Sequence, residues 1–181
     1  MKKMIKELKK LTLFTSIMGL GIASSCQQSS NKTAENTADT TKKSKYLSAP
    51  LISDIYTADP SARVFDGKIY IYPSHDVEAG TPENDNGDHF DMRDYHILSM
   101  DSVGGKVTKH DVALSVKDIP WAGRQLWAPD AAYKNGTYFL YFPVKDKEDV
   151  FRIGVATSKS PTGPFKAQPE PIKGSLSIDP A

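Results

Sequence analysis

The sequence contains a single cysteine, so no disulfide bond can form within the chain. It also lacks an excess of charge, with 23 Lys and Arg against 22 Asp and Glu and a formal net charge of +1. A nearly neutral chain without a basic stripe gives no support for nucleic-acid binding. No stretch after residue 50 has helical periodicity over the length that a stable helix needs. These absences favour an all-β fold without disulfides.

An apolar run near the N-terminus is too short to span a bilayer. The run covers residues 11–23, follows a lysine-rich start, and precedes Cys26 with small residues between them. This order predicts an export signal at residues 1–25. It resembles the lipobox of bacterial lipoproteins, in which the cysteine becomes the lipidated first residue. An ordinary signal peptide with a chance cysteine is the alternative.

Residues 26–49 are polar and rich in Ser, Thr, Asn and Lys. Such a segment cannot bury enough apolar surface to fold, and it predicts a flexible tether. We therefore expect an exported protein, lipid-anchored to a bacterial membrane through Cys26 and located in the periplasm or at the cell surface. Residues 50–181 remain for packing, which is enough for the core of one domain.

The part after residue 50 contains two similar hairpins. Residues 64–72 turn at Asp66-Gly67, residues 132–142 turn at Asn135-Gly136, and the two glycines are 69 positions apart. Further strand-like runs are residues 95–100 and 106–108, then 152–158 and 165–166. Four short strands in a repeat of about 50 to 70 residues favour propeller blades. Two unrelated hairpins in an all-β sandwich are the alternative.

A short segment of Asp, Pro and Ala precedes each hairpin and recurs at residues 178–181. The first strand of each propeller blade lines the central channel, so these aspartates would converge. Carboxylates that converge on a pocket suit glycosidic cleavage, in which one activates water and another protonates the leaving oxygen. Taken singly, each segment also reads as a turn.

These segments are Ala58-Asp59-Pro60-Ser61-Ala62-Arg63, Trp127-Ala128-Pro129-Asp130 and Ile178-Asp179-Pro180-Ala181. In this order they resemble the opening of glycoside hydrolase family 43. The resemblance implies a five-bladed β-propeller, of which residues 50–181 supply the first two blades and the start of the third. It also implies a β-xylosidase or α-L-arabinofuranosidase that hydrolyses xylan- or arabinan-derived saccharides by an inverting mechanism.

By this resemblance, Asp59 is the general base, and Asp179 orients the catalytic acid and raises its pKa. Trp127 matches a position that walls the sugar pocket, whereas Asp130 matches a structural position. The family's acid is a glutamate on a later blade, for which this sequence offers no match. We therefore expect the chain to be the N-terminal fragment of a longer enzyme and inactive by itself.

Three further residues are predicted to bind substrate. His75 and Asp76, together with residues 87–94, form an acidic loop after the first hairpin. We expect this loop to wall a subsite at the channel mouth, with His75 and Asp76 reaching sugar hydroxyls, although a solvated loop is an equal alternative. Arg124 is expected to hold a hydroxyl or to pair with an acidic neighbour.

We predict no required cofactor and no metal. A calcium site on Asp88, Asp91 and Asp94 is an alternative that we do not favour, because their spacing does not fit the EF-hand pattern. The expected partner is an oligosaccharide or a polysaccharide side chain. A glycan-binding propeller without catalysis and a purely structural surface lipoprotein remain open, as does the choice between xylose and arabinose.

Overall fold

The computed structural model describes residues 49–180, which lie within one compact unit, Ser44–Ala181. The expected signal peptide, most of the tether, Cys26 and Ala181 lie outside these described residues. The strands are β1 (Tyr56–Phe65), β2 (Lys68–Asp76), β3 (Asp94–Met100), β4 (Thr108–Ser115), β5 (Ala122–Arg124), β6 (Asp130–Lys134), β7 (Thr137–Asp146), β8 (Phe151–Ser158) and β9 (Lys166–Ala167). A short 3-10 helix, η1 (Val116–Asp118), links β4 to β5. Within residues 49–180, no helix is long and apolar enough to cross a membrane.

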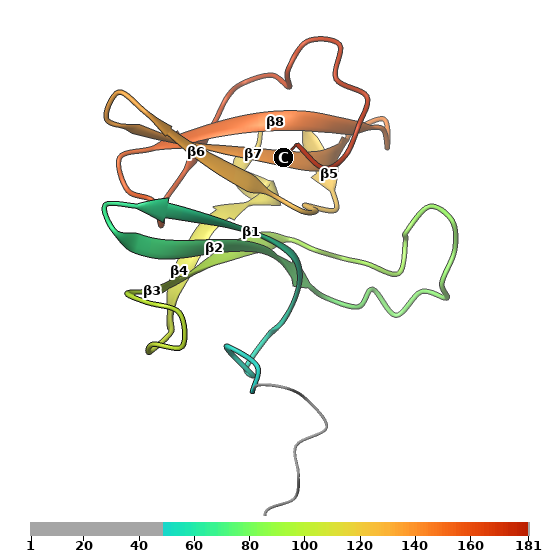
Figure 1. The fold of residues 1–181 in the computed structure, drawn as a ribbon. Helices are drawn as coiled ribbons and strands as arrows, with labels where there is room; N and C mark the ends of the chain where they lie inside the picture. Colours follow the sequence, from blue (N-terminus) through green and yellow to red (C-terminus); the bar gives the residue numbers. More distant parts are fainter. Residues whose placement is uncertain (1–48, 181) are drawn as a thin grey trace, which may run out of the picture. The chain divides into compact units, whose positions relative to one another are not determined.

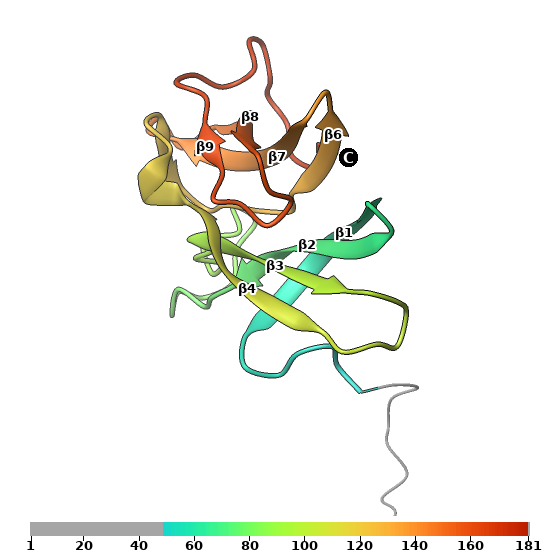
Figure 2. The same cartoon turned by 90° about the vertical axis from the view of Figure 1, so that its left-hand side faces the viewer.

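The strands form two antiparallel sheets (Figure 1). The first is a meander in the order β1-β2-β3-β4. In the second, β7 pairs with β6 along its first half and with β5 at its end, and β8 and β9 follow. Strands β1 and β6 lie on one side of the molecule, and β4 and β9 lie on the other (Figure 2). Each sheet thus runs from one side to the other in chain order, as the blades of a propeller do.

Both predicted hairpin turns are present, and both use two residues with positive φ. The angles are 49° and 76° at Asp66 and Gly67, and 52° and 73° at Asn135 and Gly136. Two consecutive positive φ angles are typical of the type I′ turn, whose twist matches that of the flanking strands. These turns fix the register of β1 with β2, in which Phe65 pairs with Lys68, and of β6 with β7, in which Lys134 pairs with Thr137.

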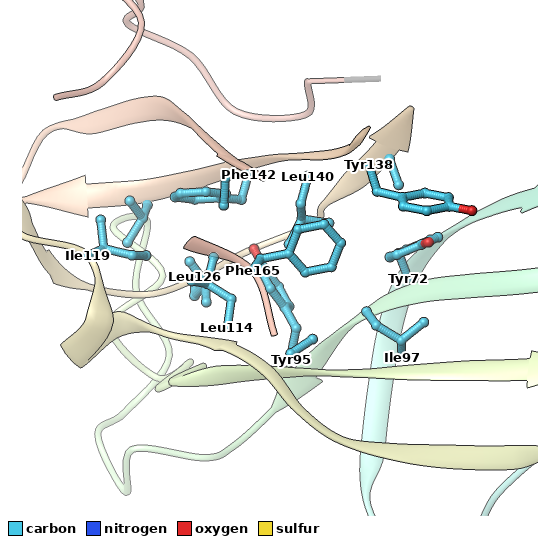
Figure 3. Packing of buried hydrophobic residues seen from close by; sticks show 14 residues of the cluster. Tyr72, Tyr95, Ile97, Leu114, Ile119, Leu126, Tyr138, Leu140, Phe142 and Phe165 are labelled. Atoms are coloured by element: carbon cyan, nitrogen blue, oxygen red, sulfur yellow. The ribbon is translucent and has the colours of Figure 1, made fainter. Parts of the chain in front are cut away.

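A hydrophobic core lies between the two sheets (Figure 3). The first sheet contributes Tyr72, Tyr95 and Ile97, and the second contributes Leu140 and Phe142 among others, all of them fully buried. Burial of side chains of this size contributes about 1.5–3 kcal/mol each. The core therefore holds the two sheets together face to face, and it fixes where their first strands meet.

The first strand of each sheet is interrupted at a proline. In β1 the pairing with β2 shifts between Ala58 and Ser61, around Asp59-Pro60. In the second sheet, β5 and β6 both pair with β7, and residues 125–129 between them, which include Pro129, belong to no strand. Proline has no N–H to donate to a ladder, so it favours such breaks. Both breaks open on the same side of the molecule, and the candidate site lies there.

Candidate active site

A cavity of about 420 Å³ lies where the three Asp/Pro segments meet. Its lining comes from residues 58–61, 127–129 and 178–180, together with Asp76, Phe90 and Met92. The three segments are separated by more than 45 residues each time in the sequence, yet they form one pocket. The predicted site residues Asp59, Asp76, Trp127 and Asp179 are all among the lining residues.

Asp59 and Asp179 share an uncommon backbone conformation. Their φ angles are 43° and 56°, in the left-handed region that residues other than glycine rarely adopt. Each precedes a proline, which disfavours the helical regions for the residue before it and favours extended backbone. Such conformations cost about 1–3 kcal/mol and cluster at functional sites. Both aspartates are exposed, so their carboxylates can meet water and ligand.

Asp76 is the last residue of β2 and pairs with Tyr56 at the start of β1. The hydroxyl of Ser74 lies 2.8 Å from Oδ1 of Asp76 and donates a hydrogen bond to it. Ser74 is fully buried and lies opposite Ala58 in the register of the two strands. This hydrogen bond therefore holds the carboxylate of Asp76 beside the segment that carries Asp59.

Trp127, the residue that the family resemblance assigns to the wall of a sugar pocket, lines the cavity. Its backbone N–H donates to the carbonyl of Pro143 at 3.0 Å, and the hydroxyl of Tyr95 donates to its carbonyl. Its ring packs against Phe151, with 4.3 Å between the centroids. The indole Nε1 is buried and has no acceptor among residues 49–180. Trp127 is thus firmly placed and has one donor free for a ligand.

A second wall of the cavity comes from the loop between β2 and β3, residues 77–93, part of which was interpreted from the sequence as either a subsite wall or a solvated loop. Phe90 of this loop lines the cavity and meets the Trp127 ring edge-on, at 6.5 Å and 89°. Gly87 lies so close to Trp127 that an added Cβ would stand 2.8 Å from Cζ2 of the indole. The Gly-Asp-His-Phe sequence does not predict these particular contacts, because they depend on Trp127, which lies about 40 residues away in the link between β5 and β6.

Gln125 holds this loop in place. The residue is 1% exposed, has a φ of 60°, and lies in the link between β5 and β6. Its side-chain amide donates to the carbonyls of Gly87 and Phe90 at 2.5 and 2.9 Å. The buried ammonium of Lys145 donates to the carbonyl of Asn86 at 3.1 Å. The loop leaves the first sheet but is fastened to the second.

Arg124 lies outside the cavity and does not reach the substrate position that we expected as one of its two roles. Its guanidinium donates to Asp149 at 2.6 and 2.8 Å and forms an ion pair with Asp88 at 2.7 Å. The hydrogen bonds to Asp149 and Asp88 raise the pKa of Arg124, and those from Arg124 lower the pKa of each carboxyl group. The structure therefore supports the alternative role, in which Arg124 pairs with acidic neighbours and fastens the loop through Asp88.

Asp130 is turned away from the cavity. The residue is 7% exposed, and its carboxylate accepts hydrogen bonds from the guanidinium of Arg63, one of them at 2.9 Å. This interaction raises the pKa of Arg63. Because Arg63 belongs to β1 and Asp130 begins β6, the pair joins a strand of the first sheet to a strand of the second, and these two strands lie side by side in Figures 1 and 2. A structural role for Asp130 fits this geometry.

His75 lines a second, open cavity of about 750 Å³ that shares Asp76 and Phe90 with the first. Its Nδ1 lies 2.6 Å from Oδ1 of Asp94. The three aspartates considered for calcium do not converge, because Asp94 meets His75, Asp91 meets Arg93 and Asp88 meets Arg124. The fold therefore offers no calcium site on these three carboxylates.

Comparison with known proteins shows the family of the chain. Residues 47–181 match the model of the glycosyl hydrolases family 43, and the chain belongs to this family. It is 65% identical over 135 residues to a xylosidase/arabinosidase 43A of Humicola insolens, a match that covers 74% of this chain and 41% of that protein. It is 61% identical over 132 residues to a xylosidase/arabinosidase of Bacteroides ovatus, covering 72% and 41%.

Among solved structures, the chain resembles CoXyl43, a β-xylosidase/α-arabinofuranosidase from a compost metagenome that was crystallised with xylotriose. The TM-score is 0.71 at 76% identity, over 72% of this chain and 40% of that one. The chain thus spans about two fifths of the length of the relatives that it matches. The predicted fold class is confirmed: the chain is all-β, and its two sheets correspond to blades of the family's five-bladed propeller.

Proposed function

We propose that this chain carries part of the active site of a glycosidase that hydrolyses xylan- or arabinan-derived saccharides. The observation that supports this most is the meeting of Asp59, Asp76 and Asp179 with Trp127 at one cavity. Hydrolysis of a glycosidic bond needs carboxyl groups on both sides of the bond. An aromatic wall suits the apolar face of a sugar ring. The relatives named above as xylosidases or arabinosidases support the same substrate class.

Asp59 is proposed as the general base. Its carboxylate is exposed at the break in β1, so a water molecule can approach it from the cavity. In an inverting reaction, the base removes a proton from water as the water attacks the anomeric carbon, and the acid protonates the departing oxygen. The two carboxyl groups must then be about 6.5–9.5 Å apart to leave room for the water.

Asp179 is proposed to act on the acid and not on the water. It stands at the cavity's third segment, where a carboxylate near a carboxylic acid raises the pKa of that acid by charge repulsion. The described lining of the cavity contains three aspartates and no glutamate. We therefore expect the glutamic acid to come from a part of the enzyme outside residues 49–180, and the chain alone to lack turnover.

A chimera tests this proposal. Residues 47–181 would replace the matching part of the Humicola insolens enzyme, which is 65% identical there and supplies the remainder of its own fold. We expect the folded chimera to hydrolyse aryl xylosides or arabinofuranosides, and the 181-residue chain alone not to. A chimera that folds and binds xylotriose without hydrolysing it would support the glycan-binding alternative. Turnover by the chain alone would contradict the assignment of the acid.

Substrates with different leaving groups distinguish the proposed roles of Asp59 and Asp179. In the chimera, Asp179→Asn should shift the alkaline limb of the pH–activity profile to lower pH. It should also slow hydrolysis of a natural disaccharide more than that of an aryl glycoside, because an aryl leaving group departs with little protonation. Asp59→Asn should slow both substrates alike, because water attack is common to them. If the better leaving group rescued Asp59→Asn instead, the two roles would have to be exchanged.

We further propose that the chain is exported and lipid-anchored at Cys26. The basic start, the apolar run and the small residues before the cysteine support this proposal. The mature protein, extracted from membranes, should lack residues 1–25 and carry additional acyl mass in intact-mass measurement. A soluble product with a different N-terminus would leave export but remove the anchor.

A further inference from the structure

Two histidines and an aspartate gather at the end of β2 and the start of β3. Each of His75, Asp94 and His96 offers one ligand atom, and the three atoms lie within 4.8 Å of one another. Oδ1 of Asp94 is 2.6 Å from Nδ1 of His75 and 3.7 Å from Nε2 of His96. Two imidazoles and a carboxylate form a typical donor set for a divalent transition metal.

The strand register explains why these side chains meet. The last pair between the two strands is Ile71 with Leu98, and continuing this antiparallel register places His75 opposite Asp94. The ladder ends at Ile71, two residues before Pro73, which has no N–H to donate. Side chains alternate along a strand, and Tyr95 and Ile97 point into the core, so Asp94 and His96 share the other face of β3. The three groups thus bridge two strands that no longer pair.

Nδ1 of His96, the ring nitrogen that does not face Asp94, is hydrogen-bonded in the way that is usual for metal-binding histidines. Nδ1 of this ring lies 3.0 Å from the carbonyl oxygen of His110 on β4. A carbonyl only accepts, so Nδ1 carries the proton and donates it, and Nε2 keeps a lone pair directed to the side of Asp94. Histidines that bind metals usually donate their other N–H to a carbonyl or a carboxylate in this manner.

The site is also accessible. The side chains of His75, Asp94 and His96 are 20, 26 and 18% exposed, and His75 lines the open cavity of about 750 Å³. An ion can therefore enter, and water can complete its coordination. Ligand atoms about 2.0–2.2 Å from zinc in tetrahedral geometry are roughly 3.2–3.6 Å apart. The three side chains need to move by about 1 Å or less to reach this spacing.

We propose that His75, Asp94 and His96 form a zinc site that joins the end of β2 to the start of β3. In the bound form Nδ1 of His75, Oδ1 of Asp94 and Nε2 of His96 are the protein ligands, and water takes the fourth position. The proton of His75 moves to Nε2 when Nδ1 binds the ion. Asp76, the neighbour of His75, lines the candidate active site, so the ion fixes the strand end that carries one of its carboxylates. This site is independent of the proposed hydrolysis.

Zinc binding to the full-length chain tests the proposal. The chain is prepared without a histidine tag and with Cys26→Ser, so that its only thiol cannot bind the ion. Titration calorimetry should show one bound Zn²⁺ per chain, and zinc should raise the melting temperature. Co²⁺ in its place should give the visible absorption of tetrahedral coordination. His75→Ala and His96→Ala should each weaken zinc binding by at least about 100-fold, because each removes a ligand.

The matched control is His110→Gln, which also removes one histidine but leaves the His110 carbonyl that His96 contacts. This control should keep the affinity and the cobalt spectrum of the parent. Asp94→Asn serves as a second ligand variant, because an amide has nearly the same shape and cannot replace the anionic oxygen. Absence of one-to-one binding, or equal affinity in the parent and both alanine variants that fold by circular dichroism, would overturn the proposal.

Discussion

Two aspartates beside prolines lie in β1 of the first sheet and at the start of β6 of the second, and they have opposite surroundings. Asp59 precedes its proline, has a φ of 43° and is exposed at the cavity. Asp130 follows its proline, is 7% exposed and is engaged by Arg63. The order of the two residues decides this difference. An aspartate before the proline lies in the break of the strand, whereas one after it already belongs to β6 and follows the strand's alternation.

An aspartate next to a proline therefore has two different roles in this fold, depending on the order of the two residues. The residue in the break has no ladder to join and presents its carboxylate to the cavity. The residue in the strand has a fixed direction and finds a partner on the neighbouring sheet. Variants of the two aspartates should therefore affect different properties, and the largest effect is expected at Asp59.

Asp59→Asn in the chimera should lower kcat by about 10³-fold or more, because the amide cannot take the proton from water. The free energy of unfolding should change by less than about 0.5 kcal/mol, since the carboxylate has no hydrogen-bond partner among residues 49–180. Steady-state kinetics and thermal melting of the same samples check both statements. An active Asp59→Asn chimera would refute the assigned base.

Asp130→Asn should have the opposite effect, with a loss of roughly 2–3 kcal/mol of stability. Removing one partner of a fully buried ion pair would destabilise the fold by more than this. Here the loss is smaller, because the Arg63 side chain is 44% exposed and its guanidinium can be hydrated once Asp130 is replaced. Thermal and urea unfolding measure the change, and the exposed Asp111→Asn is the control. If Asp130→Asn lost activity at unchanged stability, the division between the two aspartates would be wrong.

Gly87→Ala tests how far the cavity depends on its second wall. A methyl group there would meet the Trp127 ring at 2.8 Å, and the φ of +67° disfavours a side chain. Strain and displacement together should cost about 2 kcal/mol. Gly80→Ala is the matched control, because Gly80 has a φ of +71° in the same loop with nothing within 4 Å of the added atom. Tryptophan fluorescence, to which Trp121 also contributes, should change in the first variant and stay constant in the second.

Replacing Asp146 should lower the free energy of unfolding less than replacing Asp130 does, and the loss should depend on pH. Burial opposes its ionisation, but hydrogen bonds from Arg152 and from the N–H groups of Val150 and Glu148 lower its pKa overall. A carboxyl group with a lowered folded-state pKa adds stability above its unfolded-state pKa, and this stability is lost as the pH falls through the folded value. Asp146→Asn should thus cost about 1–2 kcal/mol at pH 7 and progressively less below about pH 4. Urea unfolding at both pH values measures it, and a penalty independent of pH would contradict the assignment.

Much of the fold follows from local signals in the sequence. The Asp66-Gly67 and Asn135-Gly136 turns and the alternating runs around them predict the hairpins, and the spacing predicts the blades. The meeting of the Asp/Pro segments could also be predicted, because it depends only on the repeat and on its first strand lining the channel. The strand after the Gly104-Gly105 turn was expected at residues 106–108 but runs from Thr108 to Ser115.

The loop of the second wall could be interpreted from the sequence as a subsite wall, but the contacts that place Phe90 in it could not be predicted, for a physical reason. The position of Phe90 depends on the Gln125 amide, the Lys145 ammonium and the Arg124 ion pair with Asp88, all of which are long-range contacts. Nothing in the residues near Phe90 encodes them. The choice between the two roles expected for Arg124 could not be made from the sequence for the same reason, since its partners Asp88 and Asp149 come from two different loops.

The fastening of residues 77–93 to the second sheet has a consequence for how such a protein can be recombined. The loop is encoded with the first blade, but the residues that hold it, Gln125 and Lys145, are encoded with the second. A crossover between two homologous genes within residues 94–124 would therefore join a loop from one parent to an anchor from the other. Libraries built by gene shuffling should therefore take both blades from the same parent, or should match the loop of residues 77–93 to the Gln125 and Lys145 that hold it.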